Sequence, residues 1–260
     1  MMSSIVVTEL DRMAYVKLNR PDLRNAFDPD MIQKIEDIFI GLNERKDLSA
    51  VALLGEGKVF CAGADLNWMK AMVKYSLEQN RQDSSQLFSM FEAVARCHLP
   101  ILGFVHGAAV GGAMGLLACC DYVIAEEKTQ FCFSEVKLGL APAVISPFVA
   151  RKAHLGLVRP WMLSGKVFDS IEAQRMGLVQ EIVPDGKGLS LLPKKMQMFS
   201  ESGPEAAREI KKLLFDLPGL TWEQQKERTT RFIAERRVSS EGQEGLKSFL
   251  EKREPSWRDL

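Results

Sequence analysis

Two kinds of hydrophobic pattern alternate along the first two thirds of the chain. Short apolar runs, typical of strands, occur at residues 4–10, 13–18, 50–54, 101–105 and 121–125. Longer segments at 29–42 and 77–97 repeat their apolar residues every three or four positions, as one face of a helix does. Repeated strand–helix–strand units favour a layered α/β fold with a mostly parallel sheet.

Local signals sharpen three of these predictions. Asp11 and Arg12 separate the first two runs, which predicts a hairpin. Asp28 followed by Pro29 predicts a helix start, because aspartate caps helices and proline fits the first helical position. The continuous apolar run 50–54 predicts a strand that is covered on both faces.

The last third of the chain has a different pattern. From about Ser164 onward it is mainly helical, with amphipathic stretches at 205–214, 223–236 and 241–252. The segment 185–190 contains two glycines and is a predicted hinge. We therefore predict an α/β core over residues 1–187 and a C-terminal helical oligomerisation region over residues 188–260.

Composition excludes several classes of protein. The chain has 260 residues, of which 46% are hydrophobic, and its 34 Lys and Arg balance its 34 Asp and Glu. A net charge of zero does not favour a nucleic-acid binder or a membrane-surface binder. No apolar run approaches the roughly 20 residues of a membrane span, and Glu9 and Asp11 interrupt any signal-peptide pattern, so a cytoplasmic location is expected.

The cysteines and histidines show no pattern of a metal site. The three histidines are far apart, and the five cysteines have no CxxC spacing. We expect the cysteines to be reduced, buried thiols: Cys61, Cys97, Cys119, Cys120 and Cys132.

Two glycine-bearing turns are candidates for anion binding. They occupy residues 60–66 and 106–115, and the second opens a predicted helix through 116–118. The first backbone N–H groups of a helix have no internal partner and can point at an anion. The alternative is that these glycines only allow close helix–strand packing. Neither turn has the P-loop or GxGxxG pattern.

Glu135 is the candidate for proton transfer. It lies among phenylalanine, cysteine, valine and leucine residues. Apolar surroundings raise the proton affinity of a carboxylate, which suits a general acid or base. The alternative is a glutamate bonded to a helix N-terminus or paired with Lys137. A serine hydrolase is not favoured, because no GxSxG motif is present.

Taken together, these residues resemble the enoyl-CoA hydratase/isomerase (crotonase) superfamily. The resemblance covers nearly the whole chain in family order: 19–27, 60–66, 111–112, 120–121, 135–139, 163–165, 173–179 and 244–253. It implies a crotonase-type spiral of ββα units with a C-terminal helical trimerisation region. It also implies an acyl-CoA thioester substrate, no separate cofactor, and a homotrimer or a dimer of trimers.

The resemblance also implies roles for individual residues. The backbone N–H groups of Ala64 and Gly112 form an oxyanion hole for the thioester oxygen, and Glu135 is the acid/base. The residues implied to hold CoA are Arg24, Ala26, Ala62, Gly63, Ala64, Asp65, Leu66 and Gly112. Phe249 and Lys252 are implied to approach CoA from the C-terminal helices, often those of a neighbouring subunit.

One position departs from the pattern of the family's hydratases. They carry two glutamates, and Gly115 stands at the position of the first. The chain is therefore a hydratase that works with Glu135, an enoyl-CoA isomerase, or a non-catalytic acyl-CoA-binding relative. Segments 64–69 and 138–147 resemble the bacterial methylglutaconyl-CoA hydratase group, which favours hydration of a branched or carboxylated enoyl-CoA.

Overall fold

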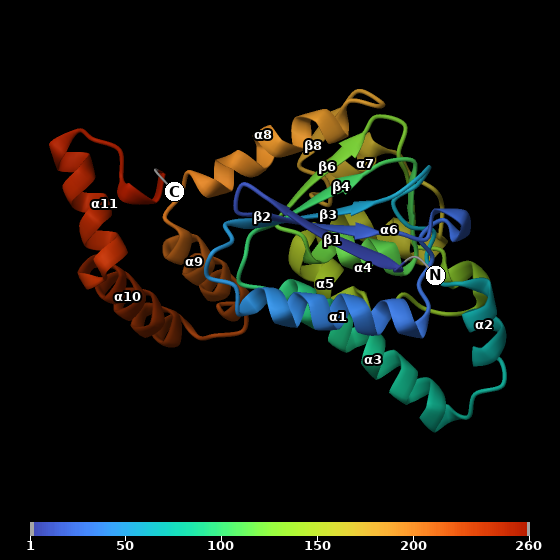
Figure 1. The fold of residues 1–260 in the computed structure, drawn as a ribbon. Helices are drawn as coiled ribbons and strands as arrows, with labels where there is room; N and C mark the ends of the chain where they lie inside the picture. The colour runs from blue at the N-terminus through green and yellow to red at the C-terminus, as the bar shows by residue number, and fades with distance from the viewer. Residues whose placement is uncertain (1–2, 259–260) are drawn as a thin grey trace.

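A computed structural model describes residues 3–258 and shows one main sheet with helices on both faces (Figure 1). The strand order is β1-β2-β3-β4-β6-β8. The strands are β1 (Ile5–Leu10), β2 (Met13–Leu18), β3 (Ala50–Gly55), β4 (Ile101–Val105), β6 (Tyr122–Glu126) and β8 (Glu181–Val183). β1 and β2 are antiparallel and all other neighbours are parallel. The predicted layered α/β architecture is therefore confirmed.

The predicted hairpin joins β1 and β2. Leu10 pairs with Met13, and the two residues between them, Asp11 and Arg12, have φ values of 49° and 61°. Two consecutive residues with positive φ make the turn type that matches the twist of a two-residue hairpin. β2 then lies parallel to β3, so the hairpin extends the parallel sheet at its edge.

Every residue of β3 is buried, as its continuous apolar run predicts. Val51 and Leu53 belong to the core beneath α1 (Pro29–Asn43), α3 (Leu77–Ala95) and α4 (Gly112–Cys119). Ala52 and Leu54 point to the opposite face, in the core beneath α8 (Gly188–Ser200). Helices thus cover both faces, as parallel sheets require.

The capping signal read from the sequence fixes the start of α1. Asp28 Oδ1 accepts a hydrogen bond of 2.8 Å from the Met31 N–H. Met31, Ile32, Ile35, Phe39 and Leu42 form the buried face. α3 ends at Ala95, two positions before the predicted end of that helix at 97.

Three short strands were not predicted. A second sheet pairs β5 (Ala108–Val110) with β7 (Gln130–Cys132) in parallel, and β8 interrupts the helical last third. The other helices that precede α8 are α2 (Leu66–Met72), α5 (Ser146–Lys152), α6 (Leu155–Ser164) and α7 (Ser170–Arg175). Three 3-10 turns lie at Pro21–Leu23, Glu135–Leu138 and Ser256–Arg258.

The C-terminal helices α9 (Pro204–Asp216), α10 (Trp222–Val238) and α11 (Ser240–Glu251) follow one another away from the sheet (Figure 1). α8, by contrast, packs on β3, β4 and β6. Large apolar side chains on the last two helices face solvent: Trp222, Val238, Phe249 and Leu250. The division of the chain at residues 187 and 188 stays a prediction.

All five cysteines are free and buried, as expected. Burial raises the pKa of the Cys61 thiol, which keeps this residue protonated beside the first glycine turn. Over residues 3–258, no helix is both long enough and apolar enough to span a bilayer.

Candidate active site

The candidate site residues meet at the carboxyl end of the parallel strands. The segment 19–27 follows β2, the turn 60–66 follows β3, and the turn 106–112 follows β4. Loops that leave neighbouring parallel strands meet at one edge of a sheet, which is where α/β proteins bind ligands. The fold therefore brings together the CoA-loop residues, both glycine turns and the helix that the second turn opens.

Main-chain hydrogen bonds hold the two glycine turns side by side. The Cys61 N–H donates to Ala108 O at 3.2 Å, and the Val110 N–H donates to Cys61 O at 3.1 Å. Gly63 has φ +94°, and a Cβ there would lie 2.9 Å from Val110 O. Only glycine allows both this conformation and this approach.

The two predicted oxyanion donors are free. The Phe27 N–H donates to Gly63 O and the Asp65 N–H donates to Phe27 O, each at 2.7 Å, so the intervening Ala64 N–H is not used by this pairing. Gly112 is the first residue of α4, where a backbone N–H has no intrahelical partner. Neither group donates to an acceptor anywhere in residues 3–258.

Glu135 lies against the second turn. The Gly111 N–H donates to Cys132 O at 2.9 Å, which ties the turn to β7, and Glu135 is three residues after the end of that strand. A Cβ on Gly111 would lie 3.6 Å from Glu135 Oε1. The carboxylate is therefore next to the residue that precedes the Gly112 donor.

One oxygen of the Glu135 carboxylate has no partner among the described residues. Its Oε2 is buried without a hydrogen-bond partner, and no ion pair joins it to Lys137. Burial raises the pKa of Glu135 above its usual value. A buried carboxylate oxygen without a partner is costly unless a ligand supplies the missing hydrogen, so Glu135 Oε2 is a candidate for contact with a ligand.

The raised pKa predicts a pH dependence. If Glu135 takes a proton from water, only its ionised form is active, so kcat/KM falls as pH decreases through the raised pKa. An assay between pH 4.5 and 8 checks this. A rate that rises toward low pH would mean that the protonated form starts the reaction.

Asn25 organises the implied CoA loop. Its backbone is left-handed, with φ 55°, and its side chain is fully buried. Asn25 Oδ1 accepts from the Arg20 N–H at 2.8 Å, and Nδ2 donates to the Glu56 carbonyl at 2.8 Å and to the Phe60 carbonyl at 3.1 Å. Asparagine tolerates this conformation better than most residues.

Arg20 joins the CoA loop to the first turn. It pairs with Asp28 at 2.9 Å and with Asp65 at 3.1 Å. Asp65 Oδ1 also accepts from the Asn67 N–H at 2.7 Å, which caps α2. Both oxygens of the Asp65 carboxylate thus have partners within the chain. The side chains of Arg24 and Leu66, by contrast, face solvent.

The space beside Gly115 is filled. A Cβ at this position would lie 2.5 Å from Ile145 Cγ2 and 2.8 Å from the Phe91 ring. Gly115 is three residues after Gly112, and Phe91 lies near a Cβ at either position, so the filled space adjoins the predicted oxyanion donor. At the position of the first glutamate, the chain has the packed apolar side chains of Ile145 and Phe91, which we call the apolar wall.

Gly115→Ala is expected to destabilise the protein. Overpacking a buried contact costs about 1–3 kcal/mol, and the methyl group meets two well-packed side chains. The matched control is Gly41→Ala in α1, where nothing lies within 4 Å and alanine is the better helix former. Denaturant unfolding of both variants checks this. Equal changes in the free energy of unfolding, in the same direction, would show that the space beside Gly115 is not filled.

Phe249 and Lys252 do not join this site within one chain. α11 lies at the opposite end of the molecule from α2 (Figure 1), and the Phe249 side chain is 81% exposed.

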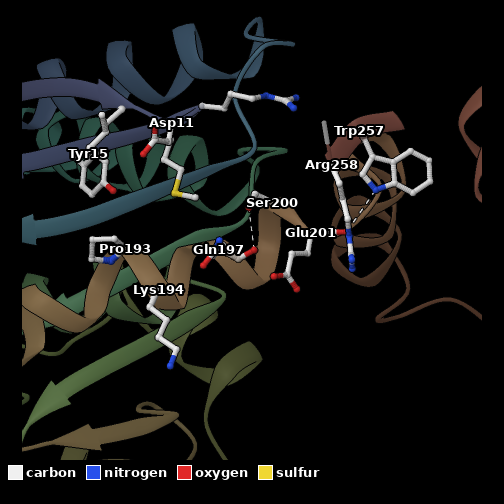
Figure 2. Close-up of a pocket in the computed structure, with 12 residues that line it drawn as sticks. Asp11, Tyr15, Pro193, Lys194, Gln197, Ser200, Glu201, Trp257 and Arg258 are labelled. Carbon is white, nitrogen blue, oxygen red and sulfur yellow. Dashed lines mark hydrogen bonds between the residues drawn. The ribbon is translucent and has the colours of Figure 1, made fainter. Parts of the chain in front are cut away.

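A separate groove of about 670 Å³ lies between the β1–β2 hairpin, α8 and the 3-10 turn Ser256–Arg258. Figure 2 shows Asp11 and Tyr15 across from Gln197. This groove is at the amino end of β2, away from the candidate site.

The family is shown by comparison with known proteins. A family model described as Enoyl-CoA hydratase/isomerase matches residues 9–260. The chain belongs to this family. It is 32% identical over 251 residues to a Thermus thermophilus protein provisionally named enoyl-CoA hydratase, a match that covers 96% of this chain and 99% of that relative. The chain is accordingly an enzyme of the enoyl-CoA hydratase/isomerase family.

Solved structures of the family share the fold. An enoyl-CoA hydratase from Shewanella pealeana is 36% identical, with a TM-score of 0.93 and coverage of 98% of this chain and 96% of that one. Pseudomonas aeruginosa AtuE is 29% identical, with a TM-score of 0.94 and coverage of 98% and 99%. The predicted crotonase-type α/β fold with a helical C-terminal region is confirmed.

Proposed function

We propose that this enzyme is a hydro-lyase that adds water to the double bond of a 2-enoyl-CoA. The observation that carries the proposal is the Glu135 carboxylate, with its buried, unpartnered Oε2, beside a turn that offers a free backbone N–H. The names of the Thermus and Shewanella relatives support hydration.

The geometry supports one order of events. The N–H groups of Ala64 and Gly112 hold the thioester oxygen. The water oxygen forms a bond to C3, its proton passes to Glu135, and the C2–C3 π electrons move to give an enolate. Glu135 then returns a proton to C2 as the carbonyl re-forms. Each fixed donor stabilises the enolate oxygen by roughly 3–4 kcal/mol.

The proposed substrate class is a branched or carboxylated enoyl-CoA such as 3-methylglutaconyl-CoA. Segments 64–69 and 138–147 support it, because they resemble the group that hydrates this compound.

A side-by-side assay tests the proposal. Purified protein is given crotonyl-CoA or 3-methylglutaconyl-CoA, and loss of the conjugated enoyl thioester is followed by absorbance. Faster loss with the branched diacid supports the proposed substrate. Faster turnover of crotonyl-CoA would instead assign a general hydratase, and turnover of neither would contradict hydration of this class.

The filled space at Gly115 favours a second candidate, an enoyl-CoA isomerase. A single carboxylate can move a proton between carbons without a second group to hold water. A gain of conjugated thioester from a 3-enoyl-CoA, without a hydroxyacyl product, would support it. The third reading, a non-catalytic acyl-CoA-binding relative, is disfavoured by Glu135 and by the two free donors.

We also propose a homotrimer or a dimer of trimers, in which Phe249 and Lys252 complete the CoA site of a neighbouring subunit. Their distance from their own site (Figure 1) and the exposed apolar side chains of α10 and α11 support it. Lys252→Ala is expected to raise KM for acyl-CoA without changing the solution mass of the oligomer. A monomeric wild-type protein would contradict the proposal.

A further inference from the structure

The wall beside Gly115 is a packed cluster rather than a single side chain. Ile145 is 2% exposed and meets the position where a residue at 115 would place its Cβ. The Phe91 ring packs on the same position and on Phe148, whose ring centroid lies 5.7 Å away. Phe88 extends the cluster toward solvent, with its ring 5.2 Å from that of Phe148.

This cluster lies close to the Gly112 N–H that is proposed to hold the thioester oxygen. A Cβ on Gly112 would lie 3.9 Å from Phe91, and a Cβ on Gly115, one helical turn further, would lie 2.8 Å from the same ring. Glu135 lies beside Gly111, at the start of the same turn. Glu135 and the cluster thus both adjoin the turn that carries the Gly112 N–H, so both are near a thioester held by that group.

Ile145 controls how much room the cluster leaves. Glycine at 115 removes every side-chain atom from that helical position, and the Ile145 methyl group takes the space instead. Close-packed interiors do not yield easily to an extra carbon. One methylene in an apolar pocket changes specificity by roughly 10–200-fold, so a side chain at this place decides which substituents fit.

We propose that Ile145 is a specificity-determining residue of this site and limits the alkyl substituent that the acyl chain carries at its β-carbon. The kinetic test of this inference rests on the proposed function, because it measures turnover. The steric limit itself also affects binding, which does not depend on turnover. The wild-type protein accepts a methyl group at the β-carbon and discriminates against an ethyl group.

The kinetic test compares 3-methylcrotonyl-CoA with 3-ethyl-2-pentenoyl-CoA, in which ethyl groups replace both β-methyl groups. Ile145→Ala is expected to lower the discrimination in kcat/KM between them by about tenfold or more. Ile145→Val is the milder variant. Ile35→Val, in the core beneath α1, is the matched control and is expected to leave the ratio unchanged. Thermal unfolding of each variant shows that it is folded.

A binding test separates this inference from the proposed reaction. The saturated analogues 3-methylbutyryl-CoA and 3-ethylpentanoyl-CoA need no chemistry, and calorimetry gives the ratio of their Kd values. A fall in that ratio of about tenfold in Ile145→Ala supports the inference even if hydration fails. A ratio within twofold of wild type in folded Ile145→Ala and Ile145→Val overturns it, whatever reaction the enzyme catalyses.

Discussion

Glu135→Gln is expected to lose roughly 10²–10⁴-fold in kcat while its affinity for a saturated acyl-CoA stays unchanged. Glutamine keeps the size of the side chain but cannot take a proton from water. The backbone donors of Ala64 and Gly112 are independent of this side chain, so the thioester is still held. Steady-state kinetics and calorimetric binding check the two parts separately.

The stability of this variant gives an independent check. The folded state raises the pKa of Glu135, so the ionised carboxylate destabilises the fold above that pKa and ceases to do so as pH falls through it. Glu135→Gln is therefore expected to unfold at a higher temperature than wild type at neutral pH. Glu127→Gln, an exposed glutamate before β7, is the control. Unchanged turnover in Glu135→Gln would contradict the assignment of the acid/base.

Gly112→Pro is expected to reduce kcat by roughly 10²–10³-fold relative to Gly112→Ala, because proline removes the N–H that stabilises the enolate oxygen. Proline fits the first position of a helix, and Gly112 is the first residue of α4. The preceding residue, Gly111, has φ 56° and ψ −123°, which is outside the helical region that proline disfavours before it.

Alanine at the same position is the matched control. A Cβ on residue 112 would lie 3.1 Å from the Phe27 ring, so both variants add this contact. Only alanine keeps the donor, because in proline a ring carbon replaces the hydrogen on the nitrogen. Comparing them measures the effect of replacing the N–H by a ring carbon, separately from the contact with Phe27. Equal kcat values for the two folded variants would show that the Gly112 N–H does not hold the reacting oxygen.

Much of the fold was predictable because its signals are local. The run at 50–54 predicts a strand buried on both faces, and Asp28 with Pro29 predicts the start of α1. The apolar neighbours of Glu135 predict its burial and raised pKa, although the sequence alone left a pairing with Lys137 open. In each case the residues that decide the structure lie within a few positions of one another.

The rest depends on contacts between distant segments. β5 and β7 have three residues each, and their pairing rather than their composition makes them strands. Asn25 is fixed by carbonyls more than thirty positions away, and Arg20 by Asp65, forty-five positions away. The sequence shows that Gly115 lacks a carboxylate, but only the packing of Ile145 and Phe91 shows that its space is filled.

The central claim, hydration by a single carboxylate, is tested most directly by turnover of 3-methylglutaconyl-CoA in H₂¹⁸O, with mass spectrometry of the acyl-CoA product. The proposed mechanism predicts a 3-hydroxyacyl-CoA that carries ¹⁸O at C3, at a rate that Glu135→Gln lowers by roughly 10²–10⁴-fold. A product of unchanged mass, or ¹⁸O incorporation at an unchanged rate in Glu135→Gln, would contradict it.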